Sequence, residues 1–135
     1  MQAVKLTGTI HQAMKQIKQP FDKAFTNAFN GIKYFFLHER NGKIQLAVAV
    51  TIIALAVCLR GTAIEWIIML LCIGLVLGFE MLNTAIEKLC DVVQEEYHPL
   101  IKTVKDVAAG AVLLLSVITI VIGSIIFIPK LLHLL

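Results

Sequence analysis

Uninterrupted apolar stretches are the strongest pattern along the chain, and each predicts a helix that crosses a membrane. The stretches without a charged residue are Ile44–Leu59, Trp66–Phe79 and Val107–Ile128. Crossing the hydrocarbon layer takes about 20 apolar residues. The third stretch is therefore long enough alone, and the first two need flanking residues to reach the interfaces. This pattern predicts an all-α membrane protein of one domain, with three transmembrane helices at about 41–59, 64–86 and 106–128.

A different pattern precedes these stretches, because large apolar side chains recur there every three or four residues. The members of this stripe are Phe21, Phe25, Phe29, Ile32 and Phe36. Such spacing is typical of an amphipathic helix. In a chain already anchored by three spans, we expect this helix to lie on the membrane surface, within an N-terminal amphipathic surface region of about 1–38. A helix packed on a soluble partner is the alternative.

Turn-forming residues interrupt the helical patterns at several points. These points are Pro20, Asn41–Gly42, Arg60–Gly61, His98–Pro99 and Pro129. Proline removes a backbone donor and crowds the preceding turn of a helix, and asparagine and glycine favour turns. Each of these points is therefore expected to separate two helices.

Composition and charge agree with a membrane protein and indicate its orientation. Apolar residues make up 59% of the chain and mean hydropathy is +0.86, well above the globular norm. Most of the 12 Lys and Arg residues precede Ile44, three lie between the second and third stretches, and one, Arg60, separates the first two. The positive-inside bias then predicts a cytoplasmic N-terminus and a cytoplasmic second loop, in a multi-pass protein of the cell inner membrane.

Carboxylates and an amide continue the second apolar stretch at helical spacing. At roughly 100° per residue, Glu80, Glu87 and Asp91 fall within about 40° of one another, and Asn83 lies about 60° to one side. If Trp66 marks the outer interface, Glu80 lies about 21 Å into a layer about 30 Å thick. An acid at that depth is a candidate functional group and suits a general base. A simple pairing with lysine, or a membrane boundary one turn earlier, is the alternative.

Further polar residues on the same side of the membrane suggest a metal and a nucleotide. Glu39 ends the segment before the first span, and several carboxylates without matching cations predict a bound divalent ion, preferably Mg²⁺. Neither common glycine-rich phosphate loop occurs, so a nucleotide site must be built otherwise. Lys105 is the natural phosphate partner in the second loop. The loop residues that could contact a nucleotide are Glu96, Tyr97, His98, Lys105 and Asp106.

The segments FEMLNTAIEKLCD and EEYHPLIKTVKD together strongly resemble the prokaryotic integral-membrane diacylglycerol kinase family. The resemblance runs from about Phe21 to the end of the third apolar stretch. It implies a homotrimer of three-span subunits with an N-terminal surface helix and active sites between subunits at the cytoplasmic interface. Members transfer the γ-phosphoryl group of Mg-ATP to a membrane lipid alcohol.

Roles for individual residues follow from this resemblance. By this resemblance, Glu80 corresponds to the catalytic base that acts on the lipid hydroxyl, and Asn83 supports that site. Glu39 and Glu87 correspond to the metal ligands of the family, and the resemblance also implies that both contact ATP. The nucleotide contacts implied are Glu96, Tyr97, His98, Lys105 and Asp106. Asp91 matches an acid of the signature without an assigned role.

The expected activity is phosphorylation of diacylglycerol to phosphatidic acid. Undecaprenol kinase is the alternative, because LHERNGKIQ around Glu39 resembles that branch of the family. Asn27 and Pro20 depart from the best-known members, which carry an aromatic and a basic residue there. From another class, a non-enzymatic membrane protein that relays ions or protons would also use Glu80, and an inactive scaffold is a third interpretation. No nucleic-acid partner is expected.

Overall fold

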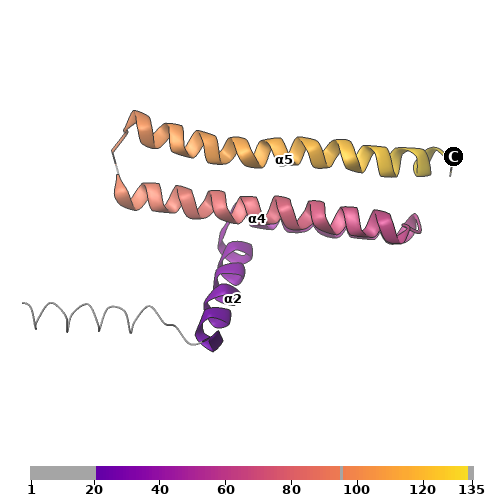
Figure 1. Ribbon diagram of the computed structural model, residues 1–135, viewed down its shortest axis with the longest axis horizontal. Helices are drawn as coiled ribbons and strands as arrows, with labels where there is room; N and C mark the ends of the chain where they lie inside the picture. The colour runs from indigo at the N-terminus through magenta and orange to yellow at the C-terminus, as the bar shows by residue number, and fades with distance from the viewer. Residues whose placement is uncertain (1–20, 95, 134–135) are drawn as a thin grey trace, which may run out of the picture. The chain divides into compact units, whose positions relative to one another are not determined.

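The computed structural model describes residues 21–94 and 96–133, and these residues form helices in every long segment. They are α2 (Phe21–His38), α3 (Arg40–Cys58), α4 (Ala63–Val93) and α5 (Pro99–Leu132), drawn in Figure 1. α3, α4 and α5 are each long and apolar enough to cross a membrane. The predicted all-α architecture with three candidate spans is confirmed. Predictions for residues 1–20, including the break at Pro20, lie outside the described residues.

α2 confirms the helix predicted from the spacing of its aromatic residues. The chain divides into two compact units, of which the first ends at Phe35 and the second begins at Phe36. Within α2 the side chains of Phe21, Phe25 and Phe29 are largely exposed. Exposed aromatic side chains along one stripe suit a helix that buries them in a membrane interface. That placement stays a prediction.

The turn between α3 and α4 is fixed by a reciprocal cap. The Glu65 backbone N–H donates to Thr62 Oγ1 at 3.4 Å, and the Thr62 N–H donates to Glu65 Oε2 at 2.6 Å. This capping box satisfies donors that the first turn of a helix otherwise leaves unpaired. Just before it, Arg60 adopts a positive φ of 49°. A Cβ added at Gly61 would lie 3.3 Å from Trp66 Nε1, so the turn packs closely against that indole. The break predicted at Arg60–Gly61 is confirmed.

Two of the predicted breaks are wrong. Asn41–Gly42 lies inside α3, because the chain turns at Glu39, whose extended backbone (φ −89°, ψ 132°) forms the N-cap. Pro129 lies inside α5, which continues to Leu132. A proline deprives the carbonyl four residues earlier of its donor. Here that loss falls in the last turns of the helix, and the His133 N–H still donates to the Pro129 carbonyl at 3.1 Å.

α4 lies alongside α5 and also packs on α3 (Figure 1). Short connections reverse the chain on either side of α4, so it runs antiparallel to both neighbours. The residues buried within this three-helix unit include Ala49, Ala56, Met69, Val76 and Val112. Most other large apolar side chains are exposed. Small residues at the contacts and apolar residues facing outward are what a helical membrane protein requires.

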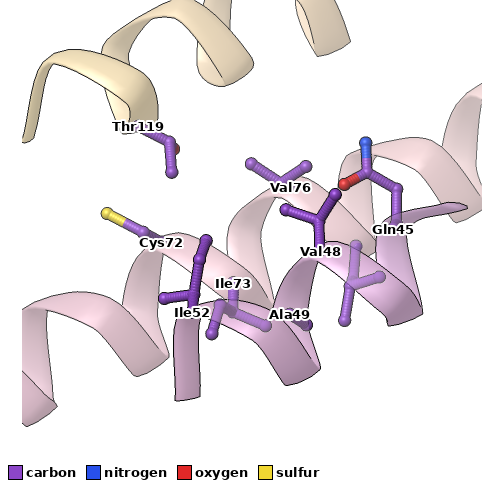
Figure 2. Close-up of a pocket in the computed structure, with 9 residues that line it drawn as sticks. Gln45, Val48, Ala49, Ile52, Cys72, Ile73, Val76 and Thr119 are labelled. Carbon is purple, nitrogen blue, oxygen red and sulfur yellow. The ribbon is translucent and has the colours of Figure 1, made fainter. Parts of the chain in front are cut away.

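A narrow apolar seam follows the contact between α3 and α4. Figure 2 shows Val48, Ala49 and Ile52 of α3 facing Ile73 and Val76 of α4, with Thr119 of α5 across from them. An adjoining groove of about 480 Å³ is bounded by all three helices. Its lining is Gln45, Val48, Ile52, Leu55, Val76, Ser116, Thr119, Ile120, Gly123, Ser124, Phe127 and Ile128. The groove therefore runs at the depth of the predicted hydrocarbon layer.

Candidate functional site

The acidic stripe of α4 begins with two buried polar residues. Glu80 is 7% exposed and Asn83 is 5% exposed, although Glu80 directly follows the apolar run that ends at Phe79. Asn83 Nδ2 donates to Glu87 Oε1 at 2.8 Å, so one turn of helix joins the amide to the next carboxylate. The stripe that sequence spacing predicted therefore exists, and its first two members are enclosed by the protein.

Two oxygen atoms of this stripe lack hydrogen-bond partners. They are Glu80 Oε2 and Asn83 Oδ1, and neither meets a donor among the residues that the structure describes. Leaving a buried polar atom unsatisfied costs roughly 1–3 kcal/mol, and more for a charged group. Most buried polar atoms have a partner in the folded protein, so each exception calls for an explanation. The unpartnered Glu80 oxygen is therefore available to accept a proton or to bind a cation.

Lysine side chains form ion pairs with several of the other acids that the sequence singles out. Lys88 Nζ lies 2.9 Å from Glu39 Oε1, which joins α4 to the N-cap of α3. Lys105 pairs with Asp91 across α4 and α5, and Lys102 pairs with Asp106 within α5. The expectation of converging carboxylates without matching cations is therefore wrong for Glu39 and Asp91. Sequence spacing is compatible with the Lys102–Asp106 pair, which lies four residues apart in α5, but it could not show the other two pairs, because they join different helices.

The turn between α4 and α5 holds a polar pocket of about 220 Å³. Its lining is Asp91, Gln94, Glu96, Tyr97, His98, Ile101, Lys102 and Lys105. Four of the five predicted nucleotide contacts are therefore brought together. The fifth, Asp106, does not line the pocket and pairs with Lys102 at its edge. The lining holds two lysines and two carboxylates, and each lysine already pairs with an acid, so a phosphate group bound here would have to compete with Asp91 and Asp106 for the ammonium groups.

Asp91 and Lys102 are pocket residues to which sequence reasoning gave no role. Lys105 Nζ donates to Asp91 Oδ1 at 2.5 Å. Lys105 precedes the uncharged run that would cross the membrane, and the hydrogen bond to Asp91 raises the pKa of its ammonium group above the ordinary value. Lys105 therefore lines the pocket with its ammonium group held by Asp91. The position of Asp91 in the acidic stripe, at helical spacing from Glu80 and Glu87, was the sequence feature that could have indicated a role for it.

The oxygen atoms near Glu80 suit a hard divalent cation, although they do not form a complete metal centre. The described residues contain no group of three or more His, Cys, Asp or Glu side chains arranged to hold a metal ion. Mg²⁺ usually takes one or two carboxylates and completes its shell with substrate phosphates and water. Glu87, with the unpartnered Asn83 oxygen beside it, and Glu39 on the neighbouring helix are ligands of that kind. The donor set fits an ion that arrives with a nucleotide.

Fold and site together define an α-helical membrane protein with a buried acid on the helix that leads to a polar pocket lined by lysines and carboxylates. A family model described as prokaryotic diacylglycerol kinase matches residues 26–127. The undecaprenol kinase of Bacillus subtilis is 41% identical over 111 residues, covering 82% of this chain and 90% of that relative. The chain therefore belongs to the prokaryotic diacylglycerol kinase family.

Other relatives are named diacylglycerol kinase. A diacylglycerol kinase of Synechocystis is 38% identical over 112 residues, which cover 82% of this chain and 64% of the relative. A diacylglycerol kinase of Haemophilus influenzae is 33% identical over 101 residues, covering 74% and 86% respectively. Family membership and the three apolar helices make the chain a prokaryotic membrane lipid kinase.

Proposed function

We propose that the chain transfers the γ-phosphoryl group of Mg-ATP to the hydroxyl of a membrane lipid, with Glu80 as the general base. The observation that carries this proposal is the buried Glu80 oxygen without a hydrogen-bond donor. It lies on the same helix as the pocket residue Asp91, about 16 Å away along the helix axis. Glu87 lies between them, so an extended nucleotide bound at the pocket would direct its phosphates towards Glu80.

Phosphoryl transfer asks little covalent chemistry of the protein and depends on positioning and on charge neutralisation. Glu80 would accept the proton of the lipid hydroxyl as its oxygen attacks the γ-phosphorus, while the bond from that phosphorus to the bridging oxygen breaks and ADP leaves. Asn83 would hold Glu87 in place through its 2.8 Å hydrogen bond. Lys105, fixed by Asp91, would bind phosphate oxygens. A Mg²⁺ ion bound to Glu39 and Glu87 would add charge neutralisation of the phosphates.

The apolar groove supports a lipid alcohol as the acceptor. Val76 lines the groove and lies one helical turn before Glu80 on α4. A hydrocarbon chain bound in the groove could therefore extend along α3 and α5 while its hydroxyl reaches the level of Glu80. The acceptor would never have to leave the bilayer, and ATP would come from the aqueous side through the pocket at the α4–α5 turn.

Undecaprenol is the acceptor that we place first, with diacylglycerol second. Diacylglycerol was the expected substrate from sequence, and that expectation stays a prediction. The 41% identity with an undecaprenol kinase exceeds the 33–38% identity with the relatives named diacylglycerol kinase. The segment around Glu39 also resembles the undecaprenol branch. We further propose a homotrimer in the inner membrane, with the N-terminus and the α4–α5 turn in the cytoplasm.

The test measures transfer of labelled phosphate from ATP with Mg²⁺ by the purified full chain in mixed micelles. Separate micelles contain undecaprenol or diacylglycerol. Glu80→Gln removes the base and is expected to lower turnover by roughly 10²–10⁴-fold while ATP still binds. Glu65→Gln is the matched control, because it makes the same change on the same helix, at a carboxylate that pairs with Lys130. It should retain transfer.

The outcomes separate the parts of the proposal. Efficient transfer to undecaprenol with little to diacylglycerol would support the substrate order, and the reverse would overturn it. Transfer to neither lipid by the wild-type chain would contradict the kinase and favour an ion or proton relay. Loss of ATP binding in Glu80→Gln would contradict the role of Glu80 as a base.

A further inference from the structure

We infer that Lys88 is the counter-ion of Glu39 in the ion-free protein and lowers the affinity of the site for a divalent cation. The inference rests on the proposed function, in which Glu39 and Glu87 bind the ion that accompanies ATP. It concerns a residue that neither the acidic stripe nor the pocket includes. Its basis is the 2.9 Å contact between Lys88 Nζ and Glu39 Oε1.

Lys88 is next to one of the two expected metal ligands in the sequence and contacts the other. Lys88 follows Glu87 in α4, so its backbone is fixed beside one expected ligand while its ammonium group reaches the other. The Glu39 side chain is 24% exposed and the Lys88 side chain is 49% exposed. The carboxylate is therefore the more enclosed partner, and the lysine is the more exposed one.

Charge balance explains why a lysine belongs at this point. Glu39 forms the N-cap of α3 without a side-chain capping hydrogen bond, so the helix start does not satisfy its carboxylate. Glu87, which precedes Lys88 on α4, is also an acid. Without a cation, these like charges would raise the free energy of the ion-free state. Lys88 offsets the charge of Glu39 until a divalent ion arrives.

The same contact opposes ion binding. A divalent cation that binds Glu39 must displace the ammonium group or approach it closely, and both cost free energy. Lysine suits an exchange of this kind, because its ammonium is a compact charge on a flexible stem and makes no rigid bidentate pair. Lys88 therefore holds Glu39 in place before the ion binds and can be displaced from it afterwards.

The test measures binding of Mn²⁺ to the purified full chain in detergent micelles without nucleotide, by electron paramagnetic resonance. Lys88→Met is expected to bind Mn²⁺ roughly two- to fivefold more tightly, the range that a partly exposed ion pair accounts for. Lys88→Arg keeps the charge and should stay close to wild type. Lys43→Met is the matched control, because Lys43 lies one turn from Glu39 on α3 and forms no ion pair with any described residue.

Glu39→Gln separates failure of the inference from failure of the proposed function. If Glu39→Gln weakens Mn²⁺ binding and Lys88→Met equals or falls below wild type, the Lys88 role is wrong and the metal role of Glu39 stands. If Lys43→Met tightens binding as much as Lys88→Met, general electrostatics explain the effect and the direct contact is overturned. If Glu39→Gln binds Mn²⁺ like wild type, both the metal role and the inference fail.

Discussion

The two ends of the α4–α5 pair carry the same kind of ion pair in different surroundings. At the capped end, Lys130 of α5 lies 2.6 Å from Glu65 Oε2 in the first turn of α4. At the pocket end, Lys105 of α5 lies 2.5 Å from Asp91 in the last turn of α4. Each pair joins the start of one helix to the end of its antiparallel neighbour.

The two pairs differ in how many interactions the acid makes with the rest of the fold. Glu65 also accepts the Thr62 N–H, and its side chain is 20% exposed. The Asp91 side chain is 65% exposed, caps nothing, and faces a pocket with a second lysine. A lysine–acid pair is thus structural where its surroundings satisfy it and available for a ligand where they do not. The comparison predicts that matched substitutions at the two ends affect different properties.

Removing the lysines one at a time should produce the largest contrast. Lys105→Met is expected to lower kcat/KM for ATP by roughly 10–100-fold, because it removes a charge-assisted hydrogen bond to phosphate. Lys130→Met should leave kcat/KM within about twofold and reduce thermal stability instead. Steady-state kinetics and thermal unfolding of both variants measure this contrast. Equal loss of activity in the two would show that the ends do not differ.

Asp91→Asn should have a smaller effect that depends on pH. It leaves the Lys105 charge but removes the carboxylate that positions it, so KM for ATP should rise roughly fivefold at pH 7.5. The raised pKa of Lys105 keeps its charge, and the ion pair, fully present below the unfolded-state value near 10.4; both are lost as pH rises through the higher folded-state value. In Asp91→Asn, KM should start to increase at a lower pH than in wild type. Superimposable profiles between pH 7 and 11 would argue against this pairing.

Thr62→Ala should give the smallest effect and leave the chemistry alone. It removes the side chain that accepts the Glu65 N–H, and loss of such a cap costs about 1 kcal/mol. We expect a drop of a few degrees in the unfolding temperature in micelles, with unchanged KM for ATP. Thr103→Ala is the control, because its hydroxyl only donates to the Pro99 carbonyl within α5. A change in KM would mean that the capped end communicates with the pocket.

Most of the fold could be predicted from the sequence because helix period and apolar length are local properties. The three candidate spans, the aromatic stripe of α2 and the turn at Arg60–Gly61 all follow from neighbouring residues. The breaks expected at Asn41–Gly42 and Pro129 were wrong, since a helix tolerates a weak residue when neighbouring hydrogen bonds continue. Turn propensity is a weaker influence than the surrounding helix in both cases.

The candidate site was predictable only in part, for a physical reason. Glu80, Asn83 and Glu87 share one helix, so helical geometry alone places them on one face. The pairs Glu39 with Lys88 and Asp91 with Lys105 depend on how separate helices pack, and charge counting along the chain cannot show them. In the structure, Glu39 and Asp91 are therefore paired with lysines and are not free carboxylates.

The close packing of Gly61 on Trp66 has a practical consequence. Trp66 is the single tryptophan of the chain, and its indole lies against the α3–α4 turn. About 37 Å of helix separates it from Asp91. Its fluorescence therefore reports the integrity of that turn and is insensitive to the occupancy of the pocket. The chain therefore carries its own optical indicator of the folding of that turn.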